Sequence, residues 1–362
     1  MGLLFLVGLT PLACSPAAPN ATGSSWPEAD ALFHADPRWL GADGAYSIDL
    51  GHDRSLWLFG DTFVATSDAH TRNESEMVRN TIGIQTGRDP TTAAMAFHWR
   101  TDPDGSPASF FPEDGELWYW PNHGVRIGED GPLVLFLSVL KPTPEEGLGF
   151  GSAGWRAVLV DNPDEDPQSW TPRPLEVPET PFDAVVGCGV VRQDGFVVAL
   201  ATRFEGSHGG HLFRIREEDV AAGAAEPEWF AGSRGWVAQG SLDGDPHEVM
   251  SDAGPECSLH FDATIGRWVH VASRGFGATT IGVRVAERIE GPYSGAADAF
   301  TPPDSKADDP FVYAAKAHPQ LDTGGEGLAV TYATNSFEFG DLFTAEGAAL
   351  YWPRFVRVQI DP

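Results

Sequence analysis

Three acidic residues stand where carboxyl groups could exchange protons with a bound molecule. Asp61 ends the apolar run of SLWLFGDTFV, Asp43 lies in the loop GADGA, and Glu256 follows a proline at the start of another apolar segment. Two carboxyl groups hydrolyse a glycosidic bond when one is held protonated and the other is ionised. Burial or a neighbouring carboxylate raises a carboxyl pKa, whereas Arg or Lys lowers it. The three residues therefore predict acid–base chemistry, with turn or loop roles as the alternative.

Basic, amide and aromatic residues accompany these acids. Arg79 and Asn80 open a strand shortly after Asp61 and are expected to donate hydrogen bonds to sugar hydroxyls. The stretch ELWYWPNHG presents three adjacent rings that either form a platform for sugar faces or pack between sheets. His123 and His318 lack the tight spacing of metal ligands, which favours hydrogen bonding over metal binding. No metal site is expected.

A repeated hairpin pattern would position these residues. Five segments combine a short alternating strand, a polar turn and a strongly apolar strand that ends in a polar residue. They are AYSIDL-GHDR-SLWLFGDT, HGVRI-GEDG-PLVLFLSVLK, VVGCGVV-RQDG-FVVALATR, CSLHF-DATIGR-WVHVASR and HPQL-DTGGEG-LAVTYATN. A third strand follows each hairpin, and a fourth extended stretch follows in four of the five.

This repeat predicts an all-β, five-bladed β-propeller with a central funnel. The last unit lacks a fourth strand, so the N-terminal segment around SWPEADALFH is expected to close it. A pair of β-sandwiches is the rival architecture, but it gives no reason for five copies of one hairpin pattern.

In a propeller, the start of the first strand and the end of the second strand of each blade open on the same face. This rule pairs residues that are 18 positions apart in three blades and 17 in the last. The pairs are Asp43 with Asp61, His123 with Lys141, Asp183 with Arg203, Glu256 with Arg274, and His318 with Asn335. We therefore predict Asp43, Asp61 and Glu256 as catalytic, and as substrate-binding Arg79, Asn80, Trp120, Asn122, His123, Lys141, Asp183, Arg203, Arg274, His318 and Asn335.

Composition agrees with an all-β protein and limits its partners. The 362 residues include 41 Gly and 29 Pro, which favours turns, and the best helical stretch, REEDVAAGAAEPEWF, is short. The net charge of −29 argues against nucleic acid or an anionic membrane surface as a partner, because phosphate groups are bound by clustered Lys and Arg.

The first 14 residues predict export. GLLFLVGLTPLAC is an apolar run too short to cross a bilayer, and it ends in small residues as a signal peptide does. Its ending also fits a bacterial lipoprotein signal with a lipid on Cys14, although no basic residue precedes the run and Pro11 replaces the usual aliphatic residue. Residues 15–25 are expected to be a flexible tether and residues 26–362 one domain. The protein is thus expected outside the cytoplasm, either free or membrane-anchored.

The other two cysteines, Cys188 and Cys257, form either a disulfide or two buried thiols. The sequence has no CxxC, HExxH, P-loop or dinucleotide fingerprint, so no cofactor is expected. Nothing in the sequence indicates an oligomeric state.

Several of these motifs resemble one family. GADGAYSIDL, LWLFGDTFV, VRNTIGIQT, NHGVRI and GPECSLHFD are similar to the bacterial domain of unknown function 4185, part of which is classed as glycoside hydrolase family 183. The resemblance spans roughly residues 35 to 360. It implies a five-bladed propeller and inverting, endo-acting hydrolysis of D-arabinan, the furanose polymer of mycobacterial arabinogalactan and lipoarabinomannan.

The same resemblance implies site residues. The family's catalytic aspartates would fall on Asp43 and Asp61, in an order of acid and base that the sequence does not assign. Fold analogy with arabinanase-like and invertase-like propellers adds an acid glutamate at Glu256.

The sequence thus predicts a secreted glycoside hydrolase that cleaves a furanose-containing polysaccharide. Two alternatives stay open: a non-catalytic carbohydrate-binding propeller and an interaction scaffold of the cell envelope. The enzyme requires a carboxyl group with a raised pKa. A scaffold would instead expose a flat apolar patch in place of a polar funnel.

Overall fold

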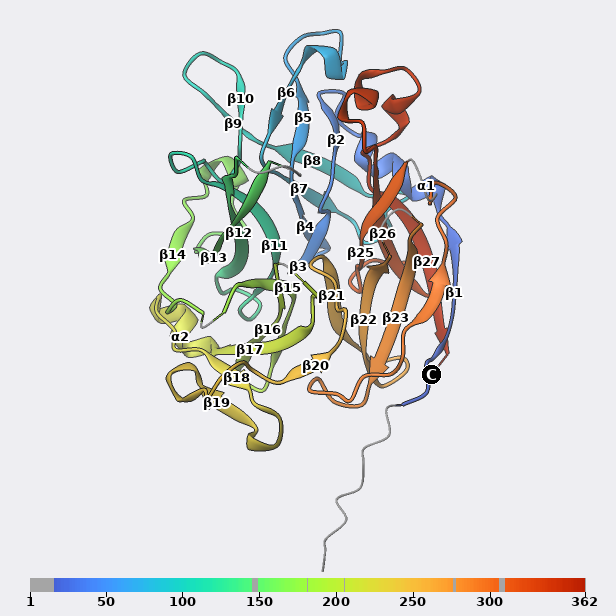
Figure 1. The fold of residues 1–362 in the computed structure, drawn as a ribbon. Coiled ribbons are helices and arrows are strands. Elements are labelled where there is room, and N and C mark those ends of the chain that lie inside the picture. The colour runs from blue at the N-terminus through green and yellow to red at the C-terminus, as the bar shows by residue number, and fades with distance from the viewer. Residues whose placement is uncertain are drawn as a thin grey trace, which may run out of the picture.

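The computed structural model describes residues 16–144, 149–180, 182–204, 206–275, 278–305 and 310–361. Within these ranges strands dominate and helices are short (Figure 1), which confirms the all-β prediction. No helix among these residues is long and apolar enough to cross a membrane. The predicted signal peptide and the lipid site at Cys14 lie outside the described residues.

Most described strands belong to five antiparallel sheets, each named here after its first strand. The β3 sheet contains β3 (Tyr46–Gly51), β4 (Arg54–Phe59), β7 (Thr81–Thr86) and β8 (Ala94–His98). The β11 sheet contains β11 (Trp118–Arg126), β12 (Leu133–Pro142), β13 (Phe150–Val160) and β14 (Arg173–Leu175). The β15 sheet contains β15 (Ala184–Gln193), β16 (Phe196–Arg203), β17 (Gly210–Arg216), β18 (Glu228–Phe230) and β19 (Trp236–Ala238), and β20 (Glu248–Met250) pairs with β17.

The β21 sheet contains β21 (Cys257–Asp262), β22 (Arg267–Arg274), β23 (Thr280–Ala286) and β24 (Ala297–Phe300). The β25 sheet contains β25 (Phe311–Ala317), β26 (Leu328–Asn335), β27 (Arg354–Asp361) and β1 (Asn20–Ser25). Two smaller sheets consist of β2 (Trp39–Ala42), β5 (Thr62–Ala65) and β6 (Ser75–Val78), and of β9 (Arg100–Thr101) and β10 (Pro107–Ala108). The α-helices are α1 (Pro27–Asp30) and α2 (Glu217–Ala222), and the 3₁₀ segments are Ala31–His34, Arg72–Glu74, Pro167–Ser169, Gly232–Arg234, Gln239–Ser241, Phe339–Phe343 and Gly347–Ala349.

The first strands of the five sheets lie around a common centre (Figure 1). Strand β3 contacts β11, β11 contacts β15, β15 contacts β21, and β21 contacts β25. The last sheet meets the first through the hydrogen bond of 2.6 Å between Ser47 Oγ and His318 Nδ1. Apolar clusters fill the spaces between neighbouring sheets; Trp57 of β4 and Phe355 of β27, for example, share one cluster. The hydrophobic core therefore consists of several clusters that lie between neighbouring sheets.

Four of the five predicted hairpins occur where the pattern placed them, as β3–β4, β11–β12, β15–β16 and β21–β22. The fifth prediction is shifted, because its first strand is β25 and the HPQL stretch follows that strand. A β-bulge interrupts the pairing of β25 between Tyr313 and Lys316, so the alternation of apolar residues is broken within the strand itself.

The tether prediction is wrong for residues 20–25. These residues form β1, which pairs with β27 over six positions and supplies the fourth strand of the β25 sheet. Gly23 has no side chain, and a Cβ at this position would overlap Phe300, so β1 also packs closely on β24 of the neighbouring sheet. The added strand therefore lies just upstream of the stretch from which it was expected.

Removing β1 should destabilise the protein, because it leaves the long edge of β27 unpaired and uncovers the end of the β21 sheet. We expect a chain that begins at Trp26 to unfold at a temperature about 5 °C or more below that of a chain that begins at Pro19. Differential scanning calorimetry of the two chains measures this. Equal unfolding temperatures would show that β1 contributes nothing to stability.

Candidate active site

Three carboxyl groups converge at the end of the sheets where the innermost strands begin. Asp43 lies between β2 and β3, Asp61 follows β4, and Glu256 immediately precedes β21. Charges on Glu256 and Asp61 both act on Asp43, which shows that the three groups share one space. The three acids that the sequence placed at one mouth therefore lie near one another in the structure.

Asp43 is the most strongly perturbed acid of the group. The hydroxyl of Tyr313 donates a hydrogen bond of 2.7 Å to Asp43 Oδ2. Burial, and then the charges of Glu256 and Asp61, raise the pKa of Asp43 to about 8, against the smaller lowering effects of Tyr313 and Lys316. A carboxyl with this pKa is protonated at neutral pH, so Asp43 can donate a proton.

Asp61 has different neighbours. The indole Nε1 of Trp120 donates a hydrogen bond of 3.0 Å to Asp61 Oδ1, and Arg79 Nη1 lies 3.5 Å from Oδ2. Burial raises the pKa of Asp61, while the bond from Trp120 and the charge of Arg79 oppose that rise. The two donors hold the carboxylate in place, and they favour its ionised form beside a protonated Asp43.

Glu256 is paired with a buried cation. Lys316 is only 1% exposed, and its ammonium group lies 3.2 Å from Glu256 Oε1. The same group donates to the carbonyl oxygens of Gly44 and Ala314 and lies 4.2 Å from the centre of the Tyr46 ring. Because Gly44 follows Asp43, this one ammonium group connects the loop of the first acid to the third.

The GDT motif has a local explanation. Gly60 leaves room for the neighbouring acid, since a Cβ there would overlap Asp43 Oδ1. The backbone N–H of Gly60 donates to Asp43 O at 3.1 Å. Thr62 is fully buried, and its hydroxyl donates to Gly60 O at 2.8 Å. The motif thus positions both aspartates at the end of an apolar strand.

Sequence reasoning missed three residues of this site: Tyr313, Lys316 and Tyr351. Burial and the charges of Asp43 and Asp61 raise the pKa of Tyr351 well above its ordinary value, which places this phenol beside the acids. Tyr351 and Ala314 both have positive φ, of 66° and 58°, and such strained backbone often occurs at functional sites. The polar residues at spacing two and three in FVYAAKAH are the signal for an inner strand there, whereas the hairpin pattern predicts that strand later in the chain, at HPQL.

Several residues that were predicted to contact the substrate are buried and form hydrogen bonds within the protein instead. Asn80 is fully buried, and its amide bonds to Phe111 and to Tyr119 O, so the expected role in sugar binding is wrong. Asn122 is also buried and donates to Ser138 Oγ and Val186 O.

The two predicted histidines lie in the wall between the sheets. His123 Nδ1 accepts from Val190 N at 2.9 Å, so Nε2 carries the proton and donates to Ser47 O at 2.9 Å. Burial lowers the pKa of His123 to about 4. His318 is fully buried between Ser47 and Thr331, after β25 rather than at its start, so its placement at the mouth is wrong. The reason is the shifted fifth hairpin.

The remaining predicted residues have no contact with the carboxylates in the described structure. Arg203 pairs with Asp245, and Arg274 pairs with Asp298. Asn335 accepts a hydrogen bond from Ser336 N in a turn, and Lys141 and Asp183 are exposed. Their strand ends are where the pattern placed them, but the side chains of Arg203 and Arg274 bind neighbouring acids.

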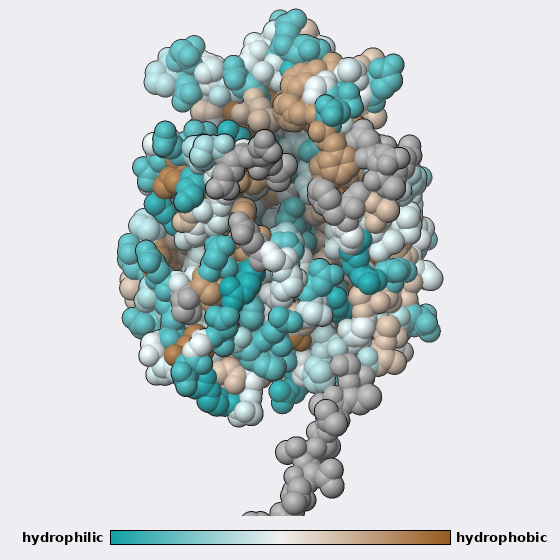
Figure 2. Space-filling model, viewed as in Figure 1, coloured by the Kyte–Doolittle hydropathy of each residue, from teal (hydrophilic) through white to brown (hydrophobic). Residues whose placement is uncertain are grey.

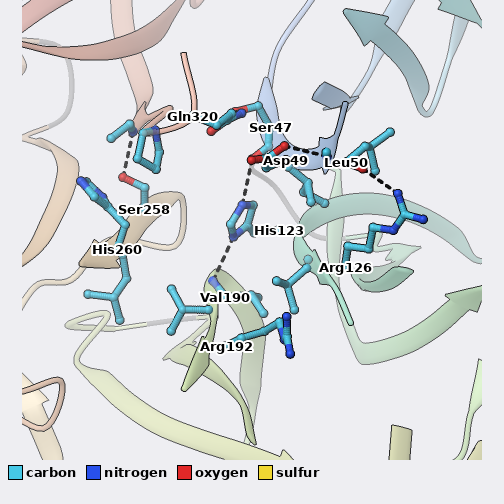
Figure 3. A pocket seen from close by; sticks show the side chains of 18 of the residues that line it. Ser47, Asp49, Leu50, His123, Arg126, Val190, Arg192, Ser258, His260 and Gln320 are labelled. Atoms are coloured by element: carbon cyan, nitrogen blue, oxygen red, sulfur yellow. Dashed lines mark hydrogen bonds between the residues drawn. The ribbon is translucent and has the colours of Figure 1, made fainter. Parts of the chain in front are cut away.

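A cavity of about 830 Å³ opens at the opposite end of the innermost strands. Figure 3 shows residues that line it, with His123 between Ser47 and Val190. None of the three carboxylates lines this cavity, whose walls combine apolar residues with charged ones such as Asp49, Arg126 and Arg192. Among the described residues, no group of three or more His, Cys, Asp or Glu side chains is arranged to hold a metal ion. The two described cysteines, Cys188 and Cys257, are buried free thiols.

These observations define an all-β protein whose sheets surround a centre and gather three acids at one end. The chain belongs to the family described as Domain of unknown function (DUF5005), whose model matches residues 28–360. That family is not domain of unknown function 4185, which the motifs resemble, so the latter resemblance enters only the proposal below. No significant match was found among curated proteins.

A solved structure from Bacteroides ovatus, provisionally assigned as a hydrolase, shares the fold. Its TM-score is 0.73 at 16% identity, over 93% of this chain and 90% of that one. The catalytic domain of a family 62 α-L-arabinofuranosidase from Coprinopsis cinerea gives 0.47 at 10% identity, over 96% and 98% of the two chains. An endo-arabinase from Bacteroides thetaiotaomicron gives 0.41 at 12% identity, over 89% and 94%. At this level of structural similarity, the activities of the last two enzymes say nothing about the activity of this chain.

A side chain at Gly60 should displace the Asp43 carboxylate. In the Gly60→Ala variant we expect this carboxylate to shift by about 1 Å, because the new Cβ would overlap Asp43 Oδ1 well inside van der Waals contact. The bond from Tyr313 should be lost, which a crystal structure of the variant would show. Gly240→Ala is the control, because a Cβ there meets no atom within 4 Å. An unmoved Asp43 with its Tyr313 bond intact would contradict the close packing of the GDT motif.

Proposed function

We propose that this protein is an exported glycoside hydrolase that cleaves a furanose-containing polysaccharide. The most specific substrate we propose is the D-arabinan of cell-wall arabinogalactan or lipoarabinomannan, cut within the chain. In this proposal the five sheets are the blades of a closed five-bladed propeller. The signal peptide directs the chain out of the cytoplasm, free or attached through a lipid on Cys14.

One observation carries the proposal: Asp43 is held protonated beside carboxylates that have ionic partners. Asp43 has a pKa of about 8, whereas Asp61 lies against Arg79 and Glu256 against Lys316. Acid–base hydrolysis of a glycosidic bond needs one protonated and one ionised carboxyl group, one on each side of the bond. A protein that only binds sugar has no use for a raised carboxyl pKa, which favours the enzyme over a binding module.

The geometry supports a division of roles. Asp43 donates its proton to the glycosidic oxygen as the bond between that oxygen and the anomeric carbon breaks. Asp61 accepts a proton from the water molecule that attacks the anomeric carbon. Each product then carries one new hydroxyl group, and solvent returns the protons to their starting positions. Direct attack by water inverts the anomeric configuration, in agreement with the implied mechanism.

Glu256 and the donors near the mouth have supporting roles in this proposal. Glu256 keeps the pKa of Asp43 high through its charge. Arg79 and Trp120 orient Asp61 and can also donate to sugar hydroxyls when a substrate is bound. The resemblance of the GAD and GDT motifs to domain of unknown function 4185 is what suggests D-arabinan over other furanose polymers.

Cleavage of polysaccharide tests the function directly. We expect the mature chain to release oligosaccharides from mycobacterial arabinogalactan and not from plant L-arabinan, as followed by chromatography. Asp43→Asn and Asp61→Asn should each lower the rate by about a hundredfold or more, because each removes a proton donor or acceptor. Proton NMR of the first products should show the inverted anomer.

Asp130→Asn is the matched control, since Asp130 is an exposed acid in the turn between β11 and β12, at the end of the sheets away from the cluster. Release that survives both active-site substitutions would exclude Asp43 and Asp61 as the catalytic pair. No release from either polymer would contradict the arabinanase assignment.

The pH dependence of the rate should report Asp43. Activity needs its protonated form, so the rate should fall as the pH rises past about 8. Lys316 lowers the Asp43 pKa, so Lys316→Met should move this alkaline limb to higher pH by roughly one unit, and Lys316→Arg should restore it. Glu256→Gln should move the limb to lower pH. A limb that stays in place in both variants would mean that another group is the acid.

A further inference from the structure

Aromatic side chains lead outward from Asp43. Tyr313 donates to the Asp43 carboxylate, and its ring centre lies 5.3 Å from that of Phe311. Phe311 in turn lies 4.5 Å from Phe337, which is 49% exposed. These three rings form a continuous series from the acid to the surface.

A second series runs beside the first. The ring of Tyr351, the other phenol next to Asp43, lies 5.5 Å from Phe63. Phe63 lies 6.1 Å from Phe339, which is 48% exposed. Both series therefore end on exposed rings of the segment that follows β26.

This exposure is unusual in the described part of the chain. Its exposed large hydrophobic residues are Phe261, Phe337 and Phe339, and two of these three lie on one short segment beside the carboxylates. In Figure 2 apolar surface gathers above the central hollow, over the region where β5 and the segment after β26 lie in Figure 1. Apolar side chains left exposed together next to a polar site usually mark a binding surface.

Aromatic residues also lie on the other side of the acids. Trp120, which donates to Asp61, packs at 4.7 Å against Phe150. These residues belong to the β11 sheet, whereas Tyr313 and Phe311 belong to the β25 sheet. The β3 sheet, which carries Asp43 and Asp61 at the ends of its strands, lies between them, so a long molecule that crosses the acids would meet rings on both sides.

Charge restricts what such a molecule can be. The protein has 52 acidic and 23 basic residues, so its net negative charge repels a polyanionic chain. Aromatic faces bind the apolar faces of sugar rings without needing charge. The surface therefore suits an uncharged polysaccharide.

We infer that Phe337 and Phe339 form a binding site for sugar residues of an uncharged polysaccharide, on the Asp43 side of the bond that is cleaved and beyond the residues that touch the acids. This inference rests on the proposed function and extends it, because it makes the protein bind long chains better than short ones. The rings act in binding only and take no part in proton transfer.

The test compares Phe337→Ala, Phe339→Ala and the double variant with Phe261→Ala. Phe261 is a matched control, since it is 51% exposed but lies near the end of β21 that is remote from the acids. With mycobacterial arabinogalactan we expect the KM of the double variant to rise about tenfold, as one modest aromatic contact per ring predicts. The rise should be clearly smaller with a short arabino-oligosaccharide, and the control should match the parent chain.

Binding without cleavage separates the two proposals. Each Phe variant is combined with Asp43→Asn, and its retardation by arabinogalactan is measured in affinity gel electrophoresis. Retardation that is lost only in the Phe337 and Phe339 variants supports the binding site, even if the parent chain releases no product and the proposed function fails. Cleavage and retardation equal to those of the Phe261 control overturn the binding site and leave the function standing. Absence of both cleavage and retardation in the parent chain overturns both.

Discussion

The structure of this site depends on how three acids share a space with little water. Three ionised carboxylates at one point would repel each other strongly, since the interaction of charges grows as the surroundings become less polar. The buried ammonium group of Lys316 relieves this by pairing with Glu256, and Arg79 does the same for Asp61 from the other side. Asp43, left with a phenol as its nearest donor, is relieved by taking up a proton. The protonation of Asp43 therefore follows from this difference in partners.

The innermost strands supply that arrangement through irregular backbone. Bulges interrupt β11, β15 and β25, so side chains that regular pleating would turn away from one another can face the same direction. In β25 the bulge directs both Tyr313 and Lys316 to the acids, with Ala314 at positive φ between them. The carbonyl of Ala314 accepts a bond from Lys316, so the strained residue is held by the side chain it helps to place. Strain of this kind persists only when the surrounding contacts determine it.

The positions of these bulges also explain which residues could be placed correctly from the sequence and which could not. Asp43, Asp61 and Glu256 were found because the flanking hairpins have regular alternation and short turns, which fix where each strand ends. His318 was misplaced because the bulge in β25 hides its alternation. Asn80 and Asn122 were misassigned for another reason: a polar side chain expected at the start of a strand bonds either to a ligand or to groups elsewhere in the protein, and only the tertiary structure shows which. The ring contacts that connect Phe337 to Asp43 join separate segments of the chain and leave no local pattern.

Buried histidines at the far end of the central space affect the electrostatic surroundings of the same acids. His123, His260 and His318 are buried there, and burial lowers their pKa values, to about 4 for the first two. They are therefore neutral at the pH where Asp43 is protonated, and His123 satisfies both ring nitrogens with backbone groups. Charged imidazoles at this depth would stabilise the ionised form of Asp43 and lower its pKa. Neutral imidazoles in the wall beneath the site thus help to preserve the poorly hydrated surroundings on which the protonated acid depends.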